Sequence, residues 1–464
     1  MGAAALLTIL ATAALPRDDP AGSRPQDRRS FVLPAESEFA ALPGVPATHR
    51  WVGVLDGAAY RIEVPASGWN GQLLMWAHGY FGEDPNLRVR DPLIRRHLIE
   101  RGYAWAASSF SKNGYDVRAG VEDTNQLALA FTAIARAHQL PLAEPTRILI
   151  AGASMGGHIA AAAVERATLA DERHRVRYAG ALPMCGVLGD TELANYFAAY
   201  HLAAVQLAGR PARSYPIENW SGLRSAVQEA LWSSFPAQLT AAGERLKAID
   251  MNLSGGARPL FAEGYADPVL LEMLWSTGGR DGTLNGVLTG NVADTRGIIY
   301  RFDGTGPESA QERAFNAGIA RAAPVAGVNE RRPGGLRWVP LLAGEFDVPV
   351  LTLHTLGDIY VPIRMEQIYR QRAATHGRAW LLVQRLIRDV GHCAFTEAEA
   401  DEAFDALTAW VAGGARPAGD DVGPAAIAAP RAGCRFTRNV AGEADHTDLD
   451  KRRAAQAHYA PCAP

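Results

Sequence analysis

The chain has 464 residues, 48% of them apolar and 20% charged, with a mean hydropathy of −0.08. This composition is typical of a folded protein with a large core and argues against a chain that is disordered throughout. The formal net charge is −3, the pI is about 6.5, and neither sign of charge forms a long block. We therefore expect no nucleic acid among its partners, and a small, roughly neutral partner instead.

The N-terminus begins MGAAALLTILATAALP, and its apolar stretch is shorter than the roughly 20 residues that a membrane-spanning helix needs. The ATA at 11–13 has the small-x-small pattern that precedes signal-peptide cleavage, and a charged, proline-containing linker follows. No Lys or Arg precedes the apolar run, so a plain alanine-rich N-terminus is the alternative. We predict a signal peptide and linker over 1–30, a secreted or periplasmic location, and no membrane span after signal removal.

From about residue 50, short apolar runs alternate with longer amphipathic ones, which is typical of the strands and crossover helices of an α/β domain. The predicted strands cover 71–80, 103–110, 147–154 and 176–186. The predicted helices cover 93–102, 122–140 and 155–167. Asp123 or Thr124 is the expected N-cap of the second helix. These elements predict the first part of an α/β core, with boundaries at 31–190.

After residue 190 the alternation stops. Residues 191–346 contain helical patterns separated by Gly- and Pro-rich loops, so we predict an inserted, mainly helical cap. Strand patterns return at 348–358 and 380–392, and a closing amphipathic helix follows at 397–414, which predicts a second core part over 347–415. The remaining tail, 416–464, is rich in Ala, Pro and Gly, and we expect it to bury little. The predicted fold class is α/β, with a mostly parallel central sheet.

The DGTLNG stretch at 281–286 briefly resembles a calcium-binding loop. Thr283 replaces one of the acidic or amide ligands, and Val292 stands where the bidentate Glu should be. We therefore interpret this stretch as a polar turn and predict no metal site there.

The sequence has four cysteines, an even number that an oxidising compartment would tend to pair. No CxxC motif or His-rich cluster indicates zinc. Of the three possible pairings we favour Cys434–Cys462, which closes the tail on itself and leaves Cys185–Cys393. Buried free thiols are the alternative.

The stretch AGASMGG at 151–157 stands between a predicted strand and a predicted helix. Gly152 and Gly156 flank Ser154 in a G-x-S-x-G pattern, and a sharp, exposed strand-to-helix turn needs such small residues because larger ones would collide with neighbouring backbone. The backbone N–H of Met155, at the positive end of the helix, can receive a developing oxyanion. The pattern predicts a nucleophile at Ser154; an ordinary tight turn is the alternative.

A serine hydroxyl is a weak nucleophile that needs a base, itself oriented by a carboxylate. Asp358 directly follows one predicted strand and His392 follows the next, so the order along the chain is Ser, Asp, His. Asp190, after the strand that precedes the cap, is the alternative acid. We expect His354 to pack inside its strand, and His158 to lie on the helix, out of reach of the serine.

A second oxyanion donor should follow an earlier strand, and the AHGYFG stretch supplies it. His78 and Gly79 end that strand, and the small glycine lets the N–H of Tyr80 approach the same point as Met155. A simple turn at His78-Gly79 is the alternative.

With HGY, GASMGG, TLGDIYVP and GHCAF in this order, the chain resembles the α/β-hydrolase superfamily over about 50–190 and 347–414. SFSKNGYDVRAGVEDT at 109–124 and the GHC ending are similar to secreted bacterial esterases of the tannase, feruloyl-esterase and polyester-depolymerase branches. Tannase-like enzymes commonly join a cysteine beside the serine to one beside the histidine, whereas alanine and methionine flank the serine here. A Cys185–Cys393 bridge would instead brace the histidine loop.

The resemblance implies a serine esterase that transfers an acyl group to water and needs no cofactor or metal. Ser154 would attack the ester carbonyl and His392 would accept its proton, while the Tyr80 and Met155 amides would hold the oxyanion. Two other functions stay open: a serine peptidase of the prolyl-oligopeptidase type, and a non-catalytic binding protein on a hydrolase scaffold.

The cap is expected to set specificity for a small-molecule or oligomeric ester. Its aromatic side chains either line a substrate pocket or form the core of the cap itself, and the usual preference of aromatic residues for the interior favours the core. These residues are Trp220, Trp232, Phe235, Trp275, Tyr300 and Phe302.

Overall fold

The computed structural model describes residues 29–35, 39–278, 282–304, 306–332, 335–442 and 447–462. Nearly all of the predicted signal peptide and linker, and residue 281 of the DGTLNG stretch, lie outside these residues. Within the described ranges, no helix combines the length and the apolar character that crossing a bilayer would require.

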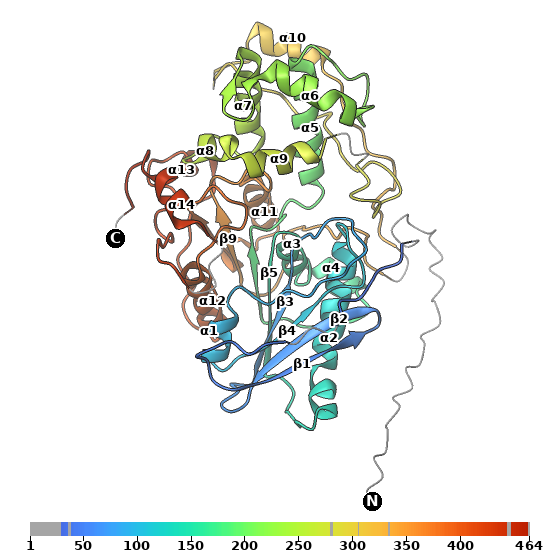
Figure 1. The fold of residues 1–464 in the computed structure, drawn as a ribbon, viewed down its shortest axis with the longest axis vertical. Coiled ribbons are helices and arrows are strands. Elements are labelled where there is room, and N and C mark those ends of the chain that lie inside the picture. Colours follow the sequence, from blue (N-terminus) through green and yellow to red (C-terminus); the bar gives the residue numbers. More distant parts are fainter. Residues whose placement is uncertain are drawn as a thin grey trace, which may run out of the picture.

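An eight-stranded sheet forms the centre of the molecule, in the order β1-β2-β4-β3-β5-β6-β9-β10 (Figure 1). The first two strands pair antiparallel, β2 also pairs antiparallel with β4, and every later pairing is parallel. The bounds are β1 Thr48–Leu55, β2 Ala58–Pro65, β3 Gln72–Ala77, β4 Ala104–Ser108, β5 Arg147–Ala153, β6 Gly180–Met184, β9 Val350–Thr355 and β10 Leu382–Ile387. This confirms the mostly parallel sheet.

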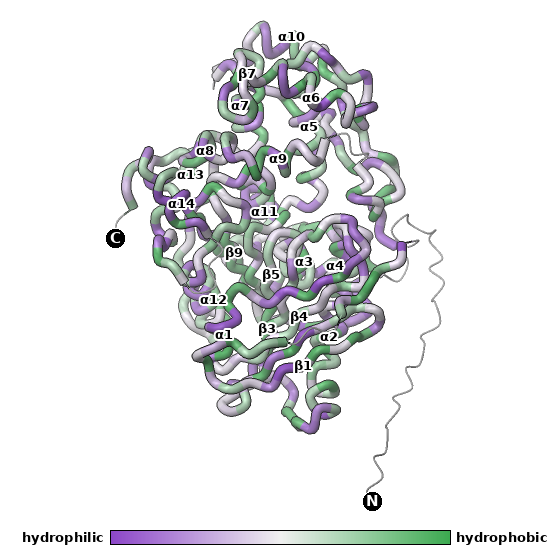
Figure 2. Tube along the Cα trace, viewed as in Figure 1, coloured by the Kyte–Doolittle hydropathy of each residue, from purple (hydrophilic) through white to green (hydrophobic). Residues whose placement is uncertain are grey.

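Parallel strands covered on both faces are apolar along their whole length. All five residues of β4 and of β6, and all six of β9 and of β10, are buried, and Figure 2 shows hydrophobic segments gathered along the centre of the sheet. Helices cover the two faces. On one face α2 (Val117–Ala137) packs on α3 (Met155–Ala162). On the other, α1 (Arg95–Glu100) and α12 (Glu397–Val411) are joined by a 2.7 Å hydrogen bond between His97 and Asp405.

The predicted start of α2 is wrong. The helix begins at Val117, and its N-cap is Asp116, whose carboxylate accepts a hydrogen bond from the Ala119 N–H. Asp123 lies inside the helix and accepts from the Ser111 N–H instead. Gly120 in the first turn lowers the helix propensity of this stretch. A Cβ at this position would come within 2.2 Å of the Ile159 side chain, so the glycine allows α2 and α3 to pack closely.

The helix predicted over 155–167 is also shorter than expected. It ends at Ala162, and Glu165 is extended and forms an isolated bridge with Phe346 before α4 (Arg166–Asp171) begins. The Glu165 carboxylate accepts hydrogen bonds from the N–H groups of Gly344 and Glu345, which fixes this connection to the chain that enters β9.

Between β6 and β9 most of the regular elements are helices, and they lie above the carboxyl end of the sheet in Figure 1. The elements of this segment are α5 Glu192–Leu207, α6 Trp220–Leu231, the hairpin β7 Trp232–Ser234 and β8 Gln238–Leu239, α7 Ala241–Leu253, α8 Phe261–Ala266, α9 Pro268–Ser276 and α10 Ala310–Gly318. The division of the chain at 190, 346 and 415 stays a prediction.

The aromatic residues of this segment pack mostly on one another. Trp220 stacks on Trp275 with ring centroids 5.3 Å apart, and Trp232 meets Trp275 edge-on at 5.6 Å. Tyr300 and Phe302 both pack against Phe315. These contacts agree with the interpretation that the aromatic residues form the segment's own core. Phe235 is the exception, since it is 37% exposed.

The expectation that the tail buries little is wrong. After α12 the chain forms α13 (Pro424–Ile427) and α14 (Leu449–Gln456). A further helix, α11 (Arg364–Thr375), lies between β9 and β10 in the sequence. Val422 and Ile427 are fully buried against the chain around β9 and β10. Arg452 of α14 is only 1% exposed, because carboxylates of the core surround it. The sequence does not predict this burial, because a charged residue is ordinarily expected at the surface.

Candidate active site

Ser154 occupies the turn between β5 and α3 in a strained conformation. Its φ is 59° and its ψ −120°, a region that a non-glycine residue rarely adopts, and its side chain makes no capping bond to the helix. The glycines beside it are required by close approach: a Cβ on Gly152 would come within 2.3 Å of the Gly156 carbonyl oxygen, and one on Gly156 within 2.0 Å of the Ala77 oxygen. The turn therefore presents the serine hydroxyl away from the helix, at the carboxyl edge of the sheet.

Three side chains from distant parts of the chain form one hydrogen-bonded series. His392 Nδ1 donates to Asp358 Oδ2 at 2.6 Å, and His392 Nε2 lies 2.8 Å from Ser154 Oγ. With the imidazole proton on Nδ1, Nε2 is left to accept the serine proton. The structure thus brings together the three residues that the sequence predicts as nucleophile, base and acid.

Asp358 is fully buried in the turn after β9. Its second oxygen, Oδ1, accepts hydrogen bonds from the backbone N–H groups of Tyr360 and Val361, at 2.9 and 3.0 Å. Burial alone would raise the pKa of Asp358, but the charge and hydrogen bond of His392, the neighbouring His354 and the Val361 N–H together hold that pKa below its ordinary value. The carboxylate therefore stays ionised and keeps the histidine oriented.

The main chain around Asp358 rests on Arg258, which no sequence pattern singled out. The Arg258 guanidinium donates to the carbonyl oxygens of Leu356, at 2.6 Å, and of Asp358, at 3.4 Å. Burial lowers the pKa of Arg258 to about 10, although Asp250, Tyr196 and Asp358 raise it. Arg258 thus ties the cap to the turn that carries the acid.

The loop of His392 is fixed from two sides. Cys393 forms a disulfide with Cys185, which directly follows β6, and Cys434 pairs with Cys462; this is the same pairing as the one favoured above. The Thr355 hydroxyl donates to the Gly391 carbonyl oxygen at 2.8 Å. The bridge therefore ties the residue next to His392 directly to the neighbouring strand end.

Arg452 holds the same loop from the tail. It donates to the Ala394 carbonyl oxygen at 2.6 Å and pairs with Asp389, whose other oxygen accepts from the Gly391 N–H. It also pairs with Glu399 at 2.8 Å. Two anions and a carbonyl from both sides of the histidine loop thus converge on one buried cation.

The other candidate acid and bases of the sequence have partners of their own. Asp190 pairs with Arg372 at 2.6 Å and accepts from the Leu342 N–H. His354 Nε2 donates to the Val361 carbonyl oxygen, and burial lowers its pKa to about 4. His158 Nε2 donates to the Pro340 carbonyl oxygen, and burial lowers its pKa also.

The predicted oxyanion loop passes directly beside the serine. A Cβ on Gly79 would lie 3.3 Å from the Ser154 Cβ, and Met155 is the first residue of α3. His78 is fixed between Phe81 and Phe110, with ring centroids at 4.6 and 4.1 Å, and burial lowers its pKa to about 4. A neutral His78, packed between two aromatic rings, supports the loop, while the oxyanion role of the Tyr80 and Met155 amides stays a prediction.

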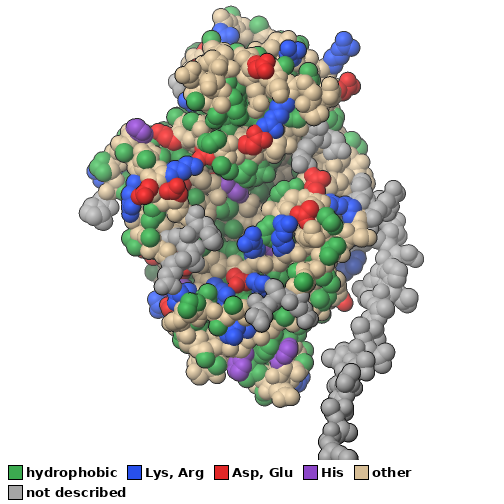
Figure 3. All heavy atoms as spheres, in the orientation of Figure 1, with side chains coloured by type: hydrophobic (Ala, Val, Ile, Leu, Met, Phe, Trp, Pro, Cys, Tyr) green, Lys and Arg blue, Asp and Glu red, His purple; other side chains and the backbone are tan. Residues whose placement is uncertain are grey.

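A hollow of about 110 Å³ opens at Ser154 between the sheet edge and the cap. Figure 3 is the space-filling view of the face on which the cap, above, meets the core, below. Aromatic side chains contribute much of the lining: Tyr80, Tyr115, Phe197, Tyr215 and Tyr360. None of the six cap aromatics weighed from the sequence is among its lining residues. Sequence alone offers no signal for this set, because its members come from five separate segments.

Within the described residues, one grouping of possible metal ligands occurs, formed by Cys185, His392 and Cys393. The two sulfurs are bonded to each other, so neither is a thiolate that could bind an ion.

No protein-family model matches the sequence, and no curated protein does. Among solved structures, feruloyl esterase B from Aspergillus oryzae is similar with a TM-score of 0.46 at 13% identity, over 82% of this chain and 85% of that one. The rice cell wall degrading esterase LipA from Xanthomonas oryzae has a TM-score of 0.35 at 15% identity, over 76% and 83%. An acylaminoacyl peptidase has a TM-score of 0.35 at 10% identity, over 75% and 38%.

At these scores and identities the three similarities carry no conclusion about activity. The fold follows from the chain's own topology: an antiparallel hairpin beside a parallel sheet in which β3 and β4 exchange places, and a G-x-S-x-G turn between β5 and α3. The chain has the α/β-hydrolase fold.

Proposed function

We propose that the protein is a secreted serine hydrolase that cleaves carboxylic ester bonds. The observation that carries the proposal is the unbroken series from Ser154 Oγ through the His392 imidazole to a fully buried Asp358, with heavy-atom distances of 2.8 and 2.6 Å. Both distances are within the range over which a proton is transferred between side chains. The two disulfides fit an oxidising compartment.

In the proposed reaction, His392 Nε2 takes the proton of Ser154 as the hydroxyl attacks the ester carbonyl carbon. The negative charge on the carbonyl oxygen is held by the backbone N–H groups of Met155 and Tyr80. His392 then returns the proton to the leaving alcohol, and an acyl-serine remains. A water molecule, deprotonated by the same nitrogen, then attacks the acyl carbon. The bond between that carbon and Ser154 Oγ breaks, Oγ takes the proton back from His392, and the acid leaves. Asp358 stabilises the imidazolium at each step and does not take up the proton.

The decisive test is substitution of the serine. Ser154→Ala should abolish turnover of p-nitrophenyl butyrate while the circular dichroism spectrum stays that of the wild type. Butyryl-p-nitroanilide, the matched amide, separates the esterase from the peptidase alternative, since only a peptidase would cleave both at comparable kcat/KM. Turnover of the ester by folded Ser154→Ala at the wild-type rate would refute the proposal.

A further inference from the structure

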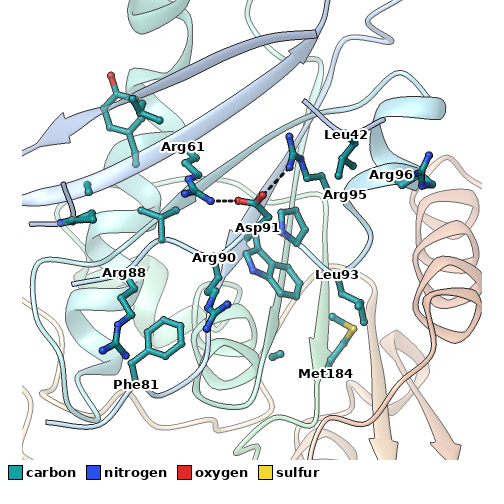
Figure 4. A pocket seen from close by; sticks show the side chains of 18 of the residues that line it. Leu42, Arg61, Phe81, Arg88, Arg90, Asp91, Leu93, Arg95, Arg96 and Met184 are labelled. Carbon is teal, nitrogen blue, oxygen red and sulfur yellow. Dashed lines mark hydrogen bonds and ion pairs between the residues drawn. The ribbon is translucent and has the colours of Figure 1, made fainter. Parts of the chain in front are cut away.

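Two cavities lie near the turn that carries Ser154. The larger, of about 1190 Å³, is beside the β1–β2 hairpin, where Arg61 and Arg95 point toward Asp91 (Figure 4). Among the described residues that line it, none belongs to the series from Ser154 to Asp358. The smaller hollow, of about 110 Å³, has Ser154 in its lining. The part of a substrate next to the ester carbonyl therefore has to fit this hollow.

Tyr115 lines the hollow, and its hydroxyl proton goes to His158. The His158 Nε2 lies 2.8 Å from the Pro340 carbonyl oxygen, which can only accept, so Nε2 carries a proton. Burial lowers the pKa of His158, so the ring is neutral and its Nδ1 is an acceptor. Tyr115 must therefore donate to Nδ1, 2.8 Å away, and its oxygen keeps only lone pairs for any other partner.

The Tyr115 hydroxyl is close to other groups of the same lining. Burial, the Asp190 carboxylate and the Tyr360 phenol together raise the pKa of Tyr115 well above its ordinary value. Since Asp190 and Tyr360 both line the hollow, the hydroxyl is at the end of the half-buried Tyr115 ring that faces it. The raised pKa also keeps the phenol protonated, as the hydrogen bond to His158 requires. The hollow therefore has an uncharged acceptor at Tyr115.

Three other polar side chains of the lining also donate their protons to the protein. The hydroxyls of Ser276 and Thr277 donate to carbonyl oxygens of α9, both at 2.7 Å. The Asn285 amide nitrogen donates to the side-chain oxygens of Tyr80 and Glu83, which uses both of its hydrogens. Like Tyr115, these side chains are left with oxygen lone pairs, so their chemistry is complementary to a hydrogen-bond donor.

The charge of the hollow favours an uncharged donor over a cation. Among the described residues that line it, Asp190 is the one carboxylate. Its Oδ2 pairs with Arg372 at 2.6 Å and accepts from the Leu342 N–H at 2.9 Å, so its negative charge is already balanced. An ammonium group would lose its water there without gaining an unpaired anion. A hydroxyl group needs only an acceptor, which Tyr115 supplies.

We propose that the hollow binds an uncharged hydroxyl group of the ester substrate, and that this group donates its proton to the Tyr115 oxygen. Tyr115 is then a specificity-determining residue. His158 is a positioning residue, because it takes the Tyr115 proton and so keeps the Tyr115 oxygen an acceptor. The inference rests on the proposed esterase function and adds the chemical class of the substrate, which is an ester with a hydroxyl close to the bond that is cleaved.

Two matched substrate pairs test this and show which part of the ester carries the hydroxyl. In the first pair, 4-nitrophenyl 3-hydroxybutyrate and 4-nitrophenyl 3-methoxybutyrate, it belongs to the acyl part, and both enantiomers are assayed. In the second, 2-hydroxyethyl butyrate and 2-methoxyethyl butyrate, it belongs to the alcohol part. Each pair keeps the oxygen but replaces the donor proton by a methyl group. The measured quantity is the discrimination ratio, which is kcat/KM for the hydroxy ester divided by kcat/KM for the methoxy ester.

The wild type should prefer the hydroxy ester in at least one pair, and Tyr115→Phe should lower that ratio about fivefold, as expected for the loss of one hydrogen bond between uncharged groups. His158→Leu should lower it too, because Tyr115 then has a free proton to donate to the methoxy oxygen. Tyr265→Phe is the matched control, since Tyr265 is a buried tyrosine of the cap outside the lining and loses the same hydroxyl. It should leave the ratios as in the wild type.

A wild-type ratio at or below one in both pairs overturns the inference, and this result needs no variant to fold. The inference also fails if folded Tyr115→Phe or His158→Leu keeps the wild-type ratios, or if Tyr265→Phe lowers them equally, which would indicate a general effect of removing a buried hydroxyl. Failure of the esterase function itself looks different, because the wild type would then hydrolyse neither member of either pair.

Discussion

Replacement of Asp358 by asparagine tests the orientation of His392, the proposed base, with almost no change of shape. Asp358 Oδ1 faces two backbone N–H donors, from Tyr360 and Val361, so the carbonyl oxygen of an asparagine must take this position. The amide nitrogen then faces His392 Nδ1, 2.6 Å away in the wild type, and donates to it. This forces the imidazole proton onto Nε2, where it blocks acceptance of the proton of Ser154.

We therefore expect Asp358→Asn to lower kcat for p-nitrophenyl butyrate about ten-thousandfold, the size of effect known for a wrong tautomer in such a triad, or about 5.5 kcal/mol of transition-state stabilisation. Stopped assays at high enzyme concentration, with the fold checked by circular dichroism, measure this. Asp190→Asn is the matched control, since Asp190 lines the hollow at the serine but pairs with Arg372; its loss should be less than about tenfold. A larger loss in Asp190→Asn than in Asp358→Asn would refute the reasoning.

Three further predictions concern stability. Replacing Cys185 and Cys393 together by serine should lower the unfolding free energy by about 2–5 kcal/mol, measured by urea titration. It should also lower kcat, because the disulfide braces the loop that carries His392. An unchanged kcat would contradict this bracing role. Arg452→Met should cost about 3–5 kcal/mol in the same titration, because two buried carboxylates lose their cation, and an unchanged urea midpoint would contradict this. Burial raises the pKa of Glu366 from 4.5 to about 7, so the folded state keeps a proton that the unfolded chain has released, and stability should fall as pH rises through this window. Glu366→Gln should flatten that fall by up to about 3 kcal/mol, and an identical pH dependence in both proteins would count against it.

The candidate catalytic residues could be predicted because their signals are local. Ser154, Asp358 and His392 each follow a short apolar run, and the carboxyl ends of parallel strands meet at one edge of a sheet. Their order along the chain is therefore enough to predict that they meet. The distances in the series add information that the sequence does not contain.

The β1–β2 hairpin could not be predicted in the same way. β1 buries only one of its eight residues, and β2 carries a charge at Glu63 on a buried position. That carboxylate is tolerated because Arg95, the Thr48 hydroxyl and the Trp105 indole N–H surround it. A buried ion pair between residues 32 positions apart disrupts the apolar alternation on which strand prediction depends.

The same limit applies to the residues that support the site. Arg452 and Arg258 act on the histidine and aspartate loops from positions far away in the sequence. The sequence does not distinguish either arginine from the rest of its 46 Lys and Arg residues. Their importance comes only from the carbonyls and carboxylates that the fold gathers around them.

Covalent labelling of the folded protein by a fluorophosphonate tests the central claim most directly, because this reagent reports a serine that is activated by a neighbouring base. The account predicts one adduct per chain by intact mass, located by peptide mapping at Ser154, absent from Ser154→Ala and formed far more slowly in His392→Ala. Folded wild-type protein that forms no adduct, or an adduct that persists in Ser154→Ala, would contradict it.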